Sequence, residues 1–296
     1  MAGESARGGV LQAEFAGRLI AAYITRYREA AAWKAAIWLG SLALFLTALV
    51  VDSLVGEAAI LGLLGSLYLL ASRLVLRPEM TRAHREGVAI QEQYDVELFG
   101  LTWNKGLADS PVPIVDVEDL ASRYQGSQAA LAGWYVGTGH APSGAAVLLR
   151  QLENVSWGRR DHQRFAILAA SSLVISVGAT VVVGLLAGAS LAAYVSTLLA
   201  PSLPWLLDLA DLSVLHWRAA ATRSEIEADL NTLWVSLGNG TPDVPPEALR
   251  EVQDRIFIAR RRFGRVPTWF YRLRHDRNKA AFDAAASRML EGKGWG

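Results

Sequence analysis

The sequence predicts an all-α integral membrane protein, with four transmembrane helices in two hairpins and a helical cytoplasmic domain formed by the middle loop and the C-terminal region. The first observation is the stretch 165–207, which contains 43 residues and no charged side chain. One helical crossing of a bilayer core takes about 20 residues, so this stretch fits two crossings joined by a tight turn around 184–190. A second apolar region, 33–76, contains two further runs of crossing length. No segment shows the alternation that is typical of a strand.

A buried hairpin in the core of a soluble protein is the alternative interpretation of 165–207. It is disfavoured because a helix at the surface of a soluble protein carries charge on its outer face. Elsewhere the chain is ordinary: 19% of its 296 residues are charged, and the net charge of +1 indicates no class of partner. The absence of Cys excludes disulfides, Cys-ligated zinc and thiolate catalysis. The N-terminus has no apolar core next to its start, so we expect no secretory signal peptide.

The sequence divides into five parts along the chain. These are an N-terminal cytoplasmic amphipathic helix, 1–32; a first transmembrane hairpin, 33–76, with spans 33–51 and 58–76; a cytoplasmic module, 77–164; a second transmembrane hairpin, 165–207, with spans 165–186 and 189–207; and a cytoplasmic C-terminal helical region, 208–296. The apolar stripe of the first helix, which includes Phe15, Leu19, Tyr23 and Tyr27, either packs on the soluble part or lies on the membrane surface.

Basic residues predict the orientation of the spans. Lys and Arg side chains flank both hairpins on one side, as at Arg28, Arg77, Arg164 and Arg218, whereas the two connecting turns contain none. Because cytoplasmic flanks carry an excess of Lys and Arg, both termini and the long middle loop are expected in the cytoplasm. In the interior of the spans the polar side chains are hydroxyls, which favours hydrogen bonding between helices over the lining of a pore.

Catalytic signals are weak. The five His residues, at 84, 140, 162, 216 and 275, are scattered singly and form no metal-binding spacing. We therefore expect no active site and no metal.

Two local features of the helices can also be predicted. Pro201 and Pro204 are expected to kink or break the helix that leaves the fourth span. Asp116 is expected to cap a short helix that extends through Tyr124.

Charge is segregated in the cytoplasmic part. The stretch 86–119 contains eight acidic residues and one basic residue, whereas 250–279 contains ten basic and three acidic residues. The basic stretch also contains Phe257, Phe263, Trp269 and Tyr271. Three interpretations fit: the two segments dock on each other, the basic stretch holds anionic lipid headgroups, or arginine and aromatic side chains bind a nucleotide.

Several motifs resemble one family. The segment 91–104, QEQYDVELFGLTWN, resembles the Q-x-x-F-D-x-x-L-F-x-L-x-W-N segment of the SMODS-associated four-transmembrane effector family, with Tyr94 in place of Phe and Thr102 in place of Pro. Shorter pieces match in the same order, namely Trp134-Tyr135, 149–157, 253–257 and 266–271. The arrangement of two spans plus two spans also matches, so the resemblance covers nearly the whole chain.

The resemblance implies a non-enzymatic effector of bacterial anti-phage defence. Such effectors act in cyclic-oligonucleotide-based anti-phage signalling (CBASS), beside a nucleotide cyclase that makes the signal. The chain would sense a cyclic di- or oligonucleotide in the cytoplasm, form a homo-oligomer and permeabilise the inner membrane, so that growth stops or the cell dies. The ligand would either open the assembly or hold it shut. A constitutive membrane scaffold or small-ion channel without nucleotide control is the alternative.

With this family in view, we expect a regulatory cyclic nucleotide and no cofactor. The expected ligand-binding residues are Arg255, Arg260, Arg261, Trp269 and Tyr271 from the C-terminal region, with Trp103 and Asn104 from the first module.

Overall fold

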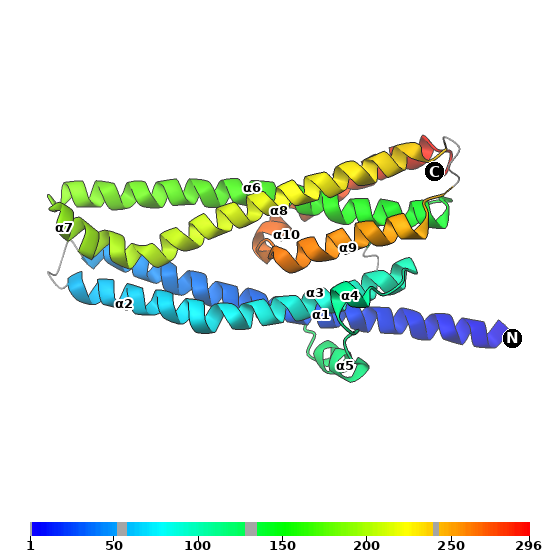
Figure 1. Ribbon diagram of the computed structural model, residues 1–296, viewed down its shortest axis with the longest axis horizontal. Coiled ribbons are helices and arrows are strands. Elements are labelled where there is room, and N and C mark those ends of the chain that lie inside the picture. The colour runs from blue at the N-terminus through cyan, green and yellow to red at the C-terminus, as the bar shows by residue number, and fades with distance from the viewer. Residues whose placement is uncertain (1, 52–57, 128–134, 239–242) are drawn as a thin grey trace. The chain divides into compact units, whose positions relative to one another are not determined.

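The computed structural model describes residues 2–51, 58–127, 135–238 and 243–296, and these ranges form helices and loops without a β-strand (Figure 1). Four of the helices are long and apolar enough to cross a membrane: Glu14–Val50, Ile60–Phe99, Ser143–Leu186 and Leu191–Ser236. The all-α fold class with four membrane helices is therefore confirmed. The expected turn at 52–57 and Trp134 of the family motif lie outside the described residues.

The helices follow one another with few interruptions. The elements are α1 (Ala2–Val51), α2 (Ala58–Ala71), the π-helix η1 (Ser72–Leu76), α3 (Arg77–Phe99), α4 (Lys105–Ala108), α5 (Ile114–Ser122), α6 (Ser143–Leu186), α7 (Leu191–Ala193), the π-helix η3 (Tyr194–Leu199), α8 (Ala200–Ser236), α9 (Pro246–Arg262) and α10 (Thr268–Glu291). Between α6 and α7 the chain reverses at Gly188, whose φ of 62° suits a residue without a side chain.

The chain forms two compact units. The first unit comprises Met1–Arg28, Ala83–Asp161 and Ala219–Gly296; the second comprises Glu29–Arg82 and His162–Arg218. Helices α1, α3, α6 and α8 contribute residues to both. The predicted domain boundaries are a separate division of the chain and stay a prediction.

The second unit contains the apolar runs of both hairpins. Close helix contact depends on glycine: a Cβ on Gly65 of α2 would lie 2.9 Å from the Cα of Pro201, and one on Gly62 would lie 3.2 Å from the carbonyl oxygen of Ser196. The outer surface of the second unit is apolar, as at Val174 of α6, which is 71% exposed. A soluble protein rarely exposes a continuous apolar surface of this kind, whereas a membrane helix directs it toward lipid.

The first unit has a core built around α1 and α3. Leu19, Tyr23 and Tyr27 are buried in it with Val88 and Ile90, and Phe15 packs against the cluster. Tyr27 also donates a hydrogen bond to Gln91 (2.7 Å). Of the two outcomes considered for the N-terminal helix, packing on the rest of the protein is therefore the one observed.

Two local predictions concern helix ends. Of the expected kink or break at Pro201 and Pro204, the break does not occur, because α8 begins at Ala200 and continues to Ser236 with Pro204 inside it. The change from π-helix to α-helix at Ala200 occurs just before Pro201, where the backbone hydrogen-bonding pattern is already shifting. Asp116 does not cap α5, since Pro113 occupies the cap position and Asp116 lies in the first turn, where a negative charge still favours the helix N-terminus.

Candidate functional site: a buried polar network in the first unit

The family-like motifs of α3 and α9 meet in a buried polar network. Glu92 and Asp95 of α3 face Arg250, Gln253 and Arg260 of α9. All of these side chains belong to the first unit, and the two helices come from sequence segments about 160 positions apart. The acidic and basic segments therefore dock on each other, as one of the three interpretations of the charge pattern expected.

Asp95 is the centre of the network and is fully buried. Its Oδ2 accepts a hydrogen bond from Arg260 (2.6 Å), and its Oδ1 accepts one from the Tyr135 hydroxyl (2.7 Å). Burial raises the pKa of the Tyr135 phenol well above its ordinary value, and the adjacent Asp95 charge raises it further. Burial lowers the pKa of Arg260, but the electrostatic effects of Asp95, Tyr135, Tyr27 and Glu92 together outweigh burial, and the net pKa is raised. Tyr135 is therefore a permanent donor and Arg260 a permanent cation.

Glu92 extends the network toward α6. Its carboxylate accepts hydrogen bonds from Arg250 and Gln253, both at 2.7 Å. Burial raises the pKa of Glu92, while the hydrogen bond from Arg250 opposes this shift. Gln253 in turn accepts a hydrogen bond from Gln151 of α6 (3.2 Å), and the Gln151 amide also donates to the Leu249 carbonyl (3.0 Å). One chain of polar contacts therefore links α3, α9 and α6.

The loop after α3 is fixed to α9 by polar contacts. Asn104 caps α4 by accepting a hydrogen bond from the Gly106 N–H, and its amide donates to Asp254 of α9 (2.7 Å). Arg250 donates to the Thr102 carbonyl and Arg261 to the Leu107 carbonyl, each at 3.2 Å. The end of the α3 motif and the 253–257 motif are therefore parts of one contact surface.

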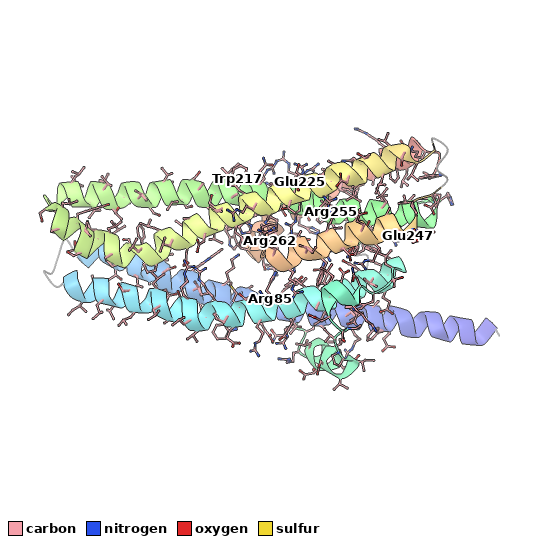
Figure 2. The ribbon with its side chains drawn as sticks, in the orientation of Figure 1. Arg85, Trp217, Glu225, Glu247, Arg255 and Arg262 are labelled. Carbon is pink, nitrogen blue, oxygen red and sulfur yellow. The ribbon has the colours of Figure 1, made fainter. Side chains whose placement is uncertain are left out.

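The structure brings together three of the seven expected ligand-binding residues. Asn104, Arg261 and Trp103 lie around the 102–109 loop, where the Trp103 indole donates to the Asp109 carbonyl (2.8 Å). Arg260 is enclosed with Asp95, and Arg255, labelled on α9 in Figure 2, pairs with Asp229 of α8.

The remaining two residues lie on α10. Trp269 is exposed there, whereas Tyr271 is partly buried against His275. The structure therefore divides the seven residues among a loop surface, a buried ion pair, the α8 side of α9 and the start of α10. Their role in ligand binding stays a prediction.

The network is suited to holding one arrangement of helices. Buried charges are costly to leave unpaired, so the set of contacts favours the packing that pairs them all and penalises any shifted packing. In the described part of the chain, no group of three or more His, Asp or Glu side chains is arranged to hold a metal ion. The arrangement therefore supports coupling among α3, α9 and α6, the helices that its polar contacts join.

Replacing Tyr135 with phenylalanine tests the network by removing a single hydroxyl group. Tyr135→Phe leaves the buried Asp95 without one of its donors, and we expect a loss of about 1–3 kcal/mol in the free energy of unfolding. The measurement is the apparent melting temperature of the full chain in detergent. Tyr94→Phe is the control, because among the described residues the Tyr94 hydroxyl has no hydrogen-bond partner and its ring stacks on Tyr135 (centroids 6.5 Å apart). Equal effects of the two changes would contradict the assignment.

Sequence reasoning missed a charged cluster in the second unit. Asp208 of α8 is buried, pairs with Arg77 at the start of α3, and accepts a hydrogen bond from Ser41 of α1 (2.9 Å). Asp211 accepts from Arg73 (3.0 Å). A buried carboxylate bonded to a hydroxyl within a span is a candidate functional feature in a membrane protein. In the sequence, the only signal of this cluster was the presence of an acidic residue directly after the apolar run 165–207.

A histidine pair was also missed. His162 and His216 are 54 positions apart, yet their Nδ1 atoms lie 2.6 Å apart in the second unit and both side chains are buried. Phe165 packs edge-on against the His216 ring (centroids 4.8 Å apart). The expectation that all five histidines stand singly was therefore wrong for these two, because the contact depends on the packing of α6 on α8.

Comparisons with known proteins provide independent evidence. The family profile described as SMODS-associating 4TM effector domain matches residues 12–289. A probable CBASS effector molecule of Bacillus cereus (strain VD146) is 27% identical over 227 residues, which cover 73% of this chain and 73% of that protein. No solved structure matches. These findings confirm the resemblance drawn from the sequence motifs.

Proposed function

The chain belongs to the SMODS-associating 4TM effector family, and we propose that it is the membrane effector of a CBASS anti-phage system. In this proposal a cyclic di- or oligonucleotide, made by a partner cyclase, binds the first unit. The bound state then changes how the membrane helices associate, the inner membrane is permeabilised, and the infected cell stops growing or dies. Both termini are cytoplasmic, and the effector acts without catalysis.

One observation carries the proposal: the family-like motifs form the buried network of the first unit, and α1, α3, α6 and α8 continue from that unit into membrane-length helices. A ligand that binds one arrangement of the first unit more tightly than another shifts the population toward it. Because the same helices supply the spans, such a shift has a direct route to the membrane. The relative from Bacillus cereus, named as a probable CBASS effector, supports the same function.

The proposed sensing surface is the 102–109 loop with the adjacent side of α9. Arg261 offers an exposed guanidinium, and Trp103 offers a partly exposed ring held in place by its bond to Asp109. Arginine forks bind phosphate oxygens, and aromatic rings stack on bases. A ligand that drew Arg261 away from the Leu107 carbonyl would release one of the contacts that fix the loop to α9.

Direct titration tests the proposed function. The full chain in detergent or nanodiscs is titrated with a panel of cyclic di- and trinucleotides, and at least one is expected to bind. Arg261→Glu and Trp103→Ala are each expected to weaken that binding at least tenfold, whereas Glu247→Gln at the far end of α9 (Figure 2) should leave it unchanged. Failure of every nucleotide to bind folded protein would contradict nucleotide control and favour a constitutive scaffold or channel.

The sign of control follows from expression without the cyclase. Harmless expression indicates that the nucleotide activates the effector, whereas lethal expression indicates that the nucleotide holds it shut. Dye leakage from liposomes containing the purified chain, measured with and without the bound nucleotide, checks the same point in isolation. Leakage that is independent of nucleotide would contradict the proposal.

A further inference from the structure

The first half of α10 carries exposed apolar side chains within a basic surface. Trp269 is 56% exposed and Leu273 is 78% exposed, and residues four apart lie on the same face of a helix. The exposed arginines near them are Arg262, Arg265, Arg272 and Arg277, and the nearby exposed acid is Asp276. Figure 2 labels Arg262 at the end of α9, just before α10 begins. We define these residues as the α10 surface.

The Trp269 ring is held in place from inside the unit. It packs edge-on against Phe270, with ring centroids 5.6 Å apart and planes at 87°, and Phe270 is itself buried. The exposure of Trp269 is therefore a property of a packed helix.

Contacts within the first unit place the α10 surface at the end where the chain leads into the spans. Arg265 lies over the ring of Tyr27, one residue before α1 leaves the unit, with its guanidinium carbon 4.3 Å from the ring centroid. Asn278 donates to Asp161 (2.9 Å), which is the last residue that α6 contributes to the unit.

The opposite end of α10 lies at the start of α6. The Trp295 carbonyl, beyond the end of α10, accepts a hydrogen bond from the His140 N–H (3.0 Å), three residues before α6 begins. Helix α10 therefore runs antiparallel to α6, with its first residues toward the spans.

Helix geometry gives the position of the surface within the first unit. From Asn278 back to Trp269 the helix rises roughly 13 Å, in the direction away from the start of α6. Trp269 and Leu273 therefore lie at the end of the first unit from which α6 leaves it after Asp161.

We propose that the α10 surface binds the anionic headgroup layer of the membrane, with Trp269 and Leu273 inserted at the boundary between headgroups and acyl chains. Trp is favoured at this depth because its ring is apolar and its N–H is polar. Arginines beside it attract acidic lipid, and their long stems let the charge reach the phosphates. A second copy of the surface is a poor partner, because a two-fold contact would bring four arginines against four arginines.

The test uses a chain that contains no cysteine. Leu273→Cys in the full chain is labelled with an environment-sensitive fluorophore, and the protein is placed in nanodiscs of phosphatidylcholine with phosphatidylglycerol. Lipids that carry a nitroxide near the headgroup are expected to quench this label at least threefold more than a label at Ala284→Cys. Ala284 is exposed and lies three helical turns further along the same face of α10, so it is the matched control. Trp269→Cys is a second position in case Leu273→Cys folds poorly.

The charge of the lipid is tested separately. Replacing phosphatidylglycerol with phosphatidylcholine, or introducing Arg272→Gln with Arg277→Gln, is expected to lower the quenching at Leu273→Cys at least twofold. Equal quenching at positions 273 and 284, or equal access of both labels to aqueous iodide, would overturn the proposal. Excimer formation between pyrene labels at Leu273→Cys would assign the surface to a second copy and would also overturn it. No nucleotide is needed, so the result is independent of the proposed sensing function.

Discussion

Arg260→Met is expected to destabilise the first unit by about 3–5 kcal/mol, because it leaves the buried carboxylate of Asp95 without its cation. Arg260 and Asp95 are both buried, and their atoms lie 2.6 Å apart. Tyr135 and Gln253 still donate to Asp95 in the variant, but neither neutralises its charge. The measurement is the apparent melting temperature of the full chain in detergent, with hydrogen exchange to locate the loss in α3 and α9.

The matched control is Arg255→Met on the same helix. Arg255 pairs with Asp229, but both side chains are exposed to solvent, so we expect a change within about 1 kcal/mol. The double variant Asp95→Leu/Arg260→Met removes both charges and should be more stable than Arg260→Met alone, since no unpaired charge remains. If Arg255→Met and Arg260→Met had equal effects, the ion pair would not be the source of the stability.

The spans could be predicted from the sequence, and docking of the charged segments was one of its three interpretations, because both depend on composition. A run of 43 residues without charge has few structural uses other than membrane crossing. Segments with opposite net charge are expected to pair somewhere. Which residues pair could not be predicted, because the choice depends on the register of α9 on α3. Arg260 is one example: its pairing with Asp95 inside the unit could not be predicted, and its expected role in ligand binding stays a prediction.

The charged cluster of the second unit illustrates the same limit. Ser41 and Asp208 are separated by 167 positions, and no local pattern connects a hydroxyl in one apolar run with an acid at the end of another. Only the packing of α1 against α8 reveals that the hydroxyl donates to the carboxylate. His162 and His216 were missed for the same reason.

Gly65→Leu is expected to disrupt the packing of the second unit. A Cβ at Gly65 would lie 2.9 Å from the Pro201 Cα and 3.4 Å from the Ala200 carbonyl oxygen, and these are backbone atoms that cannot rotate away. The two segments must separate to admit the side chain, and overpacking of this kind costs about 1–3 kcal/mol or more. The apparent melting temperature of the full chain in detergent measures the loss.

Substitutions at two further glycines test whether close backbone contact causes the destabilisation expected for Gly65→Leu. Gly178→Leu in α6 is the matched control, since nothing lies within 4 Å of a Cβ there and leucine favours a helix over glycine by about 0.5–1 kcal/mol. Gly40→Ala should fall between them. Its Cβ would clash with the Tyr68 hydroxyl, but that side chain can move at the expense of its hydrogen bond to the Ile37 carbonyl (2.7 Å). The expected order of destabilisation is Gly65→Leu, Gly40→Ala, Gly178→Leu. If Gly178→Leu lowered the melting temperature as much as Gly65→Leu, bulk in any span would be harmful and close backbone contact between α2 and α8 would not be the cause.

If the proposed function holds, Gly65→Leu should also lower membrane leakage while nucleotide binding by the first unit persists, because the change acts on the spans alone.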